Sequence, residues 1–224
     1  MTISERAPGK AELAYEAIRE AILSGGLEPG AAIDKAALCE TLGVSRFPVS
    51  AAIGRLAFER LVRVEPQHGS FVAEISAGDV REHLFLRAAL ESAVAERAAV
   101  ELDDDARADL AANLEAAEAA AEAQDRPRFY SLDVDFHAGL SGPLGLTRTA
   151  EILVGVRSHL ERVRRLLMTP RGRLSQTLTE HRAVLAAVLT GDAEAARAAM
   201  AAHIAAVSAT FEALARAKPS LFTP

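Results

Sequence analysis

The sequence predicts a mainly α-helical protein, in which an N-terminal winged helix-turn-helix precedes an all-helical bundle. Apolar residues recur at helical spacing through most of the 224 residues. Residues that favour β-structure gather in one short stretch near residue 70. Good helix formers such as Ala, Leu, Glu and Arg are abundant, and half of the residues are hydrophobic, which suffices for a sizeable core.

The first two helices are expected before residue 43. Residues 11–24 place Ile18 and Ile22 on one face, and a Gly-Gly pair and a Pro-Gly turn follow. Asp34 is a suitable N-cap for a short second helix, because its side chain can accept hydrogen bonds from first-turn amides. Gly43 is expected to end this helix.

A third helix and a hairpin complete the N-terminal pattern. Ser45 is expected to cap the third helix, whose inner face carries Val49 and Leu56. Residues that favour β-strands flank residues 66–69, which predicts a short hairpin. Three helices and a hairpin within residues 10–75 are typical of a winged helix-turn-helix, in which the third helix lies in the DNA major groove and the hairpin forms the wing.

Residues 76–217 predict a second domain, an all-helical bundle. The segment Ser76–Asp79 has the form of a capping box and opens a long helix. No strand pattern follows, and polar or glycine-containing breaks divide the segment into about six helices. These breaks lie at residues 101–105, 124–127, 141–146, 169–173 and 190–192.

The charge distribution does not by itself indicate nucleic-acid binding. The net charge is −6, and residues 1–75 contain 8 Lys and Arg against 10 Asp and Glu. A prediction of DNA binding therefore rests on the local pattern of helices rather than on total charge.

Composition also bears on the cellular compartment. No run of 18 apolar residues occurs, which argues against a membrane span, and the first ten residues lack the apolar core of a signal peptide. Cys39 is the single cysteine, so an internal disulfide is excluded. We expect a cytoplasmic protein that does not associate with membranes.

Four side chains of the C-terminal half form a candidate metal site. Asp133 and His137 are spaced i, i+4, so they share one helix face. His181 and His203 lie at similar distances on either side of the break at Gly191, so antiparallel packing of two helices would bring them level. Three imidazoles and one carboxylate suit Zn²⁺, Ni²⁺, Fe²⁺ or Mn²⁺. On spacing alone, separate core or surface histidines explain the pattern equally well.

Several short segments together indicate a family. In the N-terminal part they are Tyr15–Arg19, Leu27–Gly30, Leu42–Val49 and His68–Val72. In the C-terminal part they are Arg87–Glu91, Asp133–His137, Glu180–Arg182 and Met200–His203. The first set resembles the DNA-binding domain of the GntR family of transcriptional regulators. The second set resembles the FCD effector domain of the FadR-type branch of that family.

This resemblance implies a ligand-responsive transcriptional regulator, in most such proteins a repressor, that binds a palindromic operator in double-stranded DNA as a homodimer. It implies a divalent metal ion, zinc or nickel, held by Asp133, His137, His181 and His203. The metal would help to bind a small organic acid, and Arg87 would face the effector cavity. The alternative for Arg87 is an ion pair on the helix surface with Glu91, one turn away.

The third helix and the wing supply seven candidate DNA contacts. They are Ser45, Arg46, Phe47, Ser50, Arg55, His68 and Gly69. Arg46 suits either a guanine edge or a phosphate, and Phe47 suits either a thymine methyl group or packing against a neighbouring helix. The family commonly has a small polar residue where Phe47 stands, and arginine where Ser50 and often Gly54 stand.

The missing arginines favour an alternative, an effector-binding protein with a degenerate DNA-binding helix. A metalloenzyme acting on a small carboxylate is a third hypothesis. For an enzyme of this kind the sequence offers no convincing general base. Asp135 and Glu180 each lie within two residues of a candidate metal ligand, so their side chains point away from that ligand on the helix. In addition, no HExxH pattern occurs. We expect no enzymatic activity.

Overall fold

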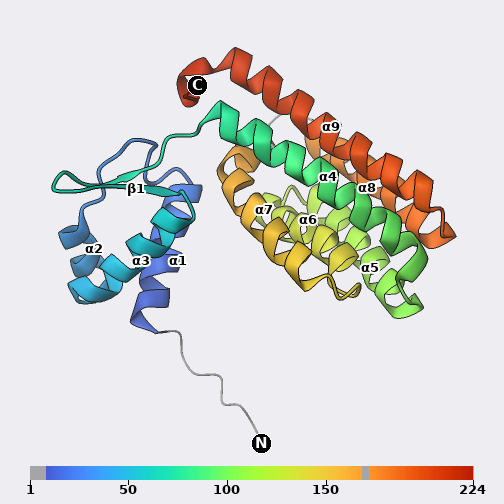
Figure 1. Ribbon diagram of the computed structural model, residues 1–224, viewed down its shortest axis with the longest axis horizontal. Helices are drawn as coiled ribbons and strands as arrows, with labels where there is room; N and C mark the ends of the chain where they lie inside the picture. Colours follow the sequence, from blue (N-terminus) through green and yellow to red (C-terminus); the bar gives the residue numbers. More distant parts are fainter. Residues whose placement is uncertain (1–8, 168–171, 224) are drawn as a thin grey trace, which may run out of the picture. The chain divides into compact units, whose positions relative to one another are not determined.

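The computed structural model describes residues 9–167 and 172–223, and it divides into two compact units (Figure 1). The first unit comprises the chain up to Ser76 together with the residues from Leu221 onward, and the second unit spans Ala77–Ser220. Within the first unit, the amide of Thr223 donates a hydrogen bond to the carbonyl oxygen of Ile75. Residues 1–8, most of the stretch in which no signal peptide is expected, lie outside the described residues.

The helices of the first unit are α1 (Lys10–Leu23), α2 (Lys35–Leu42) and α3 (Arg46–Phe58). Asp34 caps α2 as expected, because its carboxylate accepts hydrogen bonds from two first-turn amides. Gly43 ends α2 with a φ of 62°, a left-handed conformation that glycine adopts without steric cost. Ser45 precedes α3, but its side chain makes no capping hydrogen bond, contrary to expectation. The amide that such a cap commonly serves is missing here, because the third residue of α3 is Pro48.

The predicted wing is present as an antiparallel hairpin of β1 (Val62–Glu65) and β2 (Gly69–Val72). Ile18 of α1, Leu56 of α3 and Val72 of β2 are buried together in one apolar core. Burial of these side chains fixes the hairpin against the helices. The winged helix-turn-helix predicted for this half of the chain is therefore confirmed.

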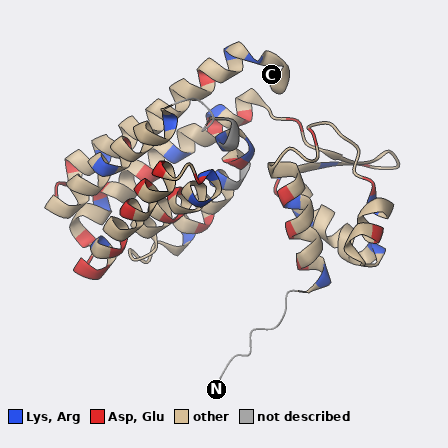
Figure 2. Cartoon of the chain, turned by 180° about the vertical axis from the view of Figure 1, so that it is seen from behind, with Lys and Arg blue, Asp and Glu red and all other residues tan. Residues whose placement is uncertain are grey.

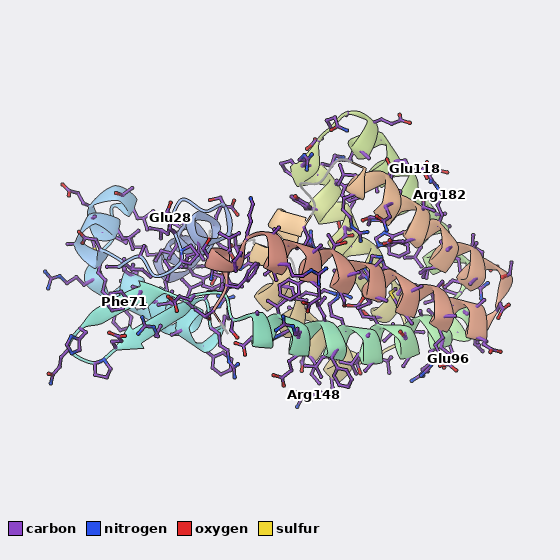
Figure 3. The ribbon with its side chains drawn as sticks, turned by 90° about the horizontal axis from the view of Figure 1, so that it is seen from above. Glu28, Phe71, Glu96, Glu118, Arg148 and Arg182 are labelled. Carbon is purple, nitrogen blue, oxygen red and sulfur yellow. The ribbon has the colours of Figure 1, made fainter. Side chains whose placement is uncertain are left out.

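The second unit contains six helices within the described residues, as the sequence predicted. They are α4 (Ala77–Glu101), α5 (Asp104–Glu122), α6 (Arg126–Ser141), α7 (Thr147–Leu167), α8 (Arg173–Thr190) and α9 (Ala193–Ala217). A short 3₁₀-helix, η1 (Pro219–Leu221), follows α9. The break expected at residues 169–173 falls largely on residues 168–171, which are not described. Glu118 of α5 and Arg182 of α8, both labelled in Figure 3, form an ion pair that joins these helices at the surface.

The two long helices α4 and α9 lie side by side, as Figures 1 and 3 both show. Met200 and Ile204 of α9 are fully buried in the core of the unit. By length and composition, α9 is also the one helix among the described residues that could cross a membrane, and 22% of its most apolar stretch is buried. This is weak evidence for a span, because core helices of soluble bundles pass the same test. The expected absence of a membrane partner stays a prediction.

Arg107 of α5 ties together the ends of two other helices. Its guanidinium donates hydrogen bonds to the carbonyl oxygens of Ala99 and Leu102 at the end of α4, at 2.9 and 3.0 Å. It also donates to the carbonyl oxygen of Leu189 near the end of α8, at 3.1 Å. Carbonyls at a helix C-terminus lack partners within their helix and form the negative end of its dipole, so a cation stabilises them.

Arg107→Ala is expected to lower the free energy of unfolding by roughly 2 kcal/mol, because three carbonyl groups lose their donor. Arg97→Ala is the matched control: Arg97 is exposed and pairs with Glu101 one turn further along α4. Surface pairs of this kind contribute little, so the control should unfold almost as the wild type does. Urea unfolding followed by circular dichroism measures both variants. If both variants lost the same free energy of unfolding, the carbonyl contacts of Arg107 would not stabilise the bundle.

Candidate metal centre and DNA-binding surface

Three histidines from three helices meet inside the second unit. His137 of α6, His181 of α8 and His203 of α9, here called the histidine cluster, present ring nitrogens that all lie within 4.8 Å of one another. All three side chains are buried. The ring of His181 stacks on Phe136 with centroids 4.2 Å apart, which restricts its orientation. The structure therefore brings three of the four predicted metal ligands to one point.

The fourth predicted ligand, Asp133, borders the histidine cluster. Its Oδ1 lies 3.7 Å from Nε2 of His181, and its Oδ2 lies 3.4 Å from the guanidinium of Arg164. It is not one of the groups whose ligand atoms all lie within 4.8 Å. Burial would raise the pKa of the Asp133 carboxyl, but Arg164 and then His181 outweigh burial and lower it. Asp133 is therefore ionised and close enough to act with the cluster.

Two further carboxylates contact ring nitrogens of the cluster. Nδ1 of His203 lies 2.7 Å from Oε2 of Glu180, and Nδ1 of His137 lies 2.7 Å from Oε2 of Glu91. The Glu91 contact is close but out of line for a hydrogen bond. Carboxylates in such positions orient metal-binding imidazoles and raise their basicity. The sequence indicated only that Glu180 is turned away from His181, and missed that it reaches His203 on the next helix.

The protonation states of His137 and His181 suit metal binding. Burial lowers the pKa of His137 to about 4, although Glu91 opposes this shift. Burial also lowers the pKa of His181 well below its usual value. Both rings are therefore neutral near pH 7, which is the form that binds metal ions. Nε2 of His181 is buried without a hydrogen-bond partner among the described residues, which is costly unless a ligand satisfies it. These residues fit a divalent metal ion.

Arginines form the other side of this centre. Arg87 of α4 and Arg157 of α7 donate hydrogen bonds to the buried carboxylate of Glu91, at 2.8 and 3.2 Å. Burial would raise the pKa of Glu91, but Arg87 in the first place holds it well below its usual value. With Arg164 and residues of α6, the arginines enclose a cavity of about 10 Å³, which has room for no more than one water molecule. A larger ligand requires side chains or helices to move.

Two expectations were stated for Arg87, a position facing the effector cavity and an ion pair with Glu91. It forms the ion pair with Glu91 that was the alternative, but the pair is buried rather than on the helix surface. Its guanidinium also lies 3.4 Å from Nε2 of His137, and it lines the cavity. The alternative was thus wrong about the location of the pair.

Sequence reasoning did not find Arg157 and Arg164. They are seven residues apart on α7, so they share a helix face, and this spacing was the available signal. The signal is weak because α7 contains five arginines. Their shared direction becomes meaningful once Glu91 and Asp133 are seen to lie opposite them.

In the first unit, all seven predicted DNA contacts are exposed. They are Ser45, Arg46, Phe47, Ser50, Arg55, His68 and Gly69. Phe47 is 81% exposed, so the alternative that it packs against a neighbouring helix is wrong. His68 and Gly69 lie at the turn of the wing, as expected.

Arg55 differs from the other predicted contacts because its charge is already paired. Its guanidinium lies 2.9 Å from Glu12 of α1 and 3.4 Å from Glu59, and it is 3.6 Å from the ring centroid of Tyr15. A contact between Arg55 and DNA would compete with these interactions. Figure 2 likewise shows acidic and basic residues interspersed over this unit in that view.

Comparisons with known proteins identify both halves of the chain. Residues 10–72 match the family described as bacterial regulatory proteins, gntR family, and residues 82–206 match the FCD domain. An HTH-type transcriptional regulator in an unstable DNA locus of Streptomyces ambofaciens is 34% identical, with 93% of this chain and 87% of the relative covered. The HTH-type transcriptional repressor RspR of Escherichia coli K12 is 29% identical, with 87% and 85% covered.

A solved structure supports the fold. The Escherichia coli protein McbR/YncC matches with a TM-score of 0.78 at 21% identity, with 92% of this chain and 98% of that chain covered. The curated relatives are transcriptional regulators rather than enzymes, in agreement with the sequence-based expectation.

Glu91→Gln is expected to lower the free energy of unfolding by roughly 3–5 kcal/mol, because it leaves two buried guanidiniums without their carboxylate. Glu101→Gln is the matched control, since Glu101 pairs with Arg97 at the same i, i+4 spacing on the same helix but at the surface. Its unfolding should change little. Chemical unfolding of both variants measures the difference. Similar stabilities for the two variants would contradict the importance of charge compensation at Glu91.

Proposed function

Because the chain belongs to the GntR family of bacterial regulatory proteins and carries an FCD domain, we propose that it is an acid-responsive, metal-containing transcriptional repressor. The GntR domain implies DNA binding, and the FCD domain implies a small-molecule effector. The role of repressor is supported by RspR, which is described as a repressor. The observation that carries the sensory part is the buried histidine cluster beside three arginines.

The proposed metal ligands are the histidine cluster and Asp133. FCD domains bind a metal ion in some members. Here the neutral imidazoles of His137 and His181, the carboxylates beside His137 and His203, and the partnerless nitrogen of His181 support such a site. Imidazole-rich sites suit zinc and nickel. When bound, the ion supplies a positive centre that favours an acidic ligand.

The proposed effector is a small organic acid. Arg87, Arg157 and Arg164 present three positive charges, and their carboxylate partners Glu91, Asp133 and Glu161 present three negative charges. The side chains of this centre therefore balance one another, and a bound metal ion would supply the excess positive charge that favours an acid. A guanidinium binds a carboxylate through two parallel hydrogen bonds, so an entering acid can replace a carboxylate of the protein as the partner of an arginine.

This exchange provides a route from effector binding to DNA release. Two of the three arginines belong to α7, and the cavity has room for no more than one water molecule, so an acid displaces α7 or its side chains on binding. In a homodimer on a palindromic operator, the spacing of the two winged helices must match the half-sites. An effector that favours another arrangement lowers operator affinity, and the operator lowers effector affinity to the same extent.

His181→Ala is expected to remove the bound metal and to lower the thermal midpoint to that of chelator-treated wild type, because a ligand nitrogen is lost. His68→Ala is the matched control, since His68 is exposed on the wing. It should retain wild-type metal content, measured by plasma mass spectrometry, and an unchanged response to chelator. Wild-type metal content in His181→Ala would overturn the proposed ligand set.

Operator release by an acid is the second expected outcome. Gel shifts with the promoter of the operon that encodes this protein should show binding by the metal-loaded protein. Thermal shifts with hydroxy acids, sugar acids, dicarboxylates and amino acids should identify the effector. In Arg87→Lys the side chain keeps its charge but loses the bidentate geometry. The variant protein should therefore still bind the operator, but a higher concentration of acid should be needed to release it from the DNA.

Failure to bind DNA, with metal and acid binding retained, would instead support the effector-binding protein with a degenerate DNA-binding helix. The pairing of Arg55 with Glu12 and the absence of arginine at Ser50 and Gly54 are the observations that favour this second candidate. Operator binding that no acid or chelator changes would overturn the sensory part alone.

A further inference from the structure

Part of the outward face of α3 is apolar. Phe47, Ala51, Gly54 and Phe58 follow one another at spacings of four, three and four residues, so they form one exposed stripe along the helix. Phe47 is 81% exposed and Phe58 is 90% exposed. Large apolar side chains on a surface commonly mark an interaction site. This stripe lies on the helix that a winged helix-turn-helix inserts into the major groove.

Few polar groups on this face can form hydrogen bonds with base edges. Arg55 is engaged by Glu12, Glu59 and Tyr15, and Gly54 has no side chain. Ser50 offers one short hydroxyl. Arg46 is the exposed cation of the first turn. Recognition by several arginine forks is therefore not available to this helix in the observed conformation.

The DNA major groove offers one apolar group, the 5-methyl group of thymine. Residues in the N-terminal turn of a recognition helix contact base edges, and Phe47 is the second residue of α3. Phe58 lies eleven residues further on, about 16 Å along the helix axis. Only the first of the two phenylalanines is therefore placed to contact a base in this docking geometry.

We infer that Phe47 contacts a thymine methyl group in each operator half-site, and that this apolar contact is a determinant of sequence specificity. The inference rests on the proposed DNA-binding function. It assigns the exposure of Phe47 to recognition of DNA rather than to a protein partner. Contact with the methyl group removes apolar surface of both partners from water, which favours thymine over bases that lack the group.

The test replaces thymine by deoxyuridine, which lacks the 5-methyl group and keeps the same base pairing. An operator is first selected from random duplexes by the full-length, metal-loaded protein. Each thymine of the operator is then replaced singly, and dissociation constants are measured at one salt concentration. At one thymine per half-site, deoxyuridine should weaken binding about fourfold, and replacement in both half-sites should weaken it roughly fifteenfold.

Two variants connect this effect to the side chain. Phe47→Ala should bind the thymine and deoxyuridine operators equally, whereas Phe58→Ala should keep the wild-type discrimination. Both positions are exposed, so neither substitution should unfold the domain, and their thermal midpoints check this. Discrimination that persists in Phe47→Ala would overturn the inference, as would an operator in which no thymine is sensitive. Selection of no operator would overturn the proposed DNA-binding function along with it.

Discussion

The compensation of buried charge around Glu91 is the constraint on which the helical unit depends. Glu91, Arg87 and Arg157 meet in the interior, where an unpaired ion costs several kcal/mol. Their contacts join α4 to α7, and Arg164 joins α7 to Asp133 of α6. The position of α7 is therefore determined by charges as well as by apolar packing. A change in the charges at this centre must change how α7 is held.

This arrangement also bears on how so small a site could accept the proposed acid. The arginines have already lost most of their hydration in the folded protein, so an entering carboxylate does not bear that cost alone. It takes the place of a carboxylate that the protein already supplies, and the number of ion pairs can be conserved. Asp133 belongs to both parts of the centre, because it contacts His181 on one side and Arg164 on the other. Because the Asp133 carboxylate can interact with either side, it connects the proposed metal site with the proposed effector site.

The sequence predicted those features that have local or periodic causes. The winged helix followed from three short apolar patterns and a hairpin, and the spacing of Asp133 with His137 indicated a shared helix face. The contacts it missed join residues far apart in the chain. Arg55 is paired with Glu12, 43 residues earlier, and this pairing has no periodic signal. Glu180 was judged from its own helix, whereas its partner His203 lies on the next one.

The slight negative charge of the DNA-binding unit places a particular demand on its contacts with bases. Residues 1–75 carry more acidic than basic groups, and Arg63 of the wing is paired with Glu65. Neutralisation of phosphates supplies most of the affinity of non-specific binding, so this unit gains less from that source than a basic domain does. In the proposed dimer, specific contacts and the joint binding of two half-sites would then contribute a larger share of the affinity. The proposed change in spacing would release such a dimer more easily, because little non-specific attraction would remain once the two half-sites could not be bound together.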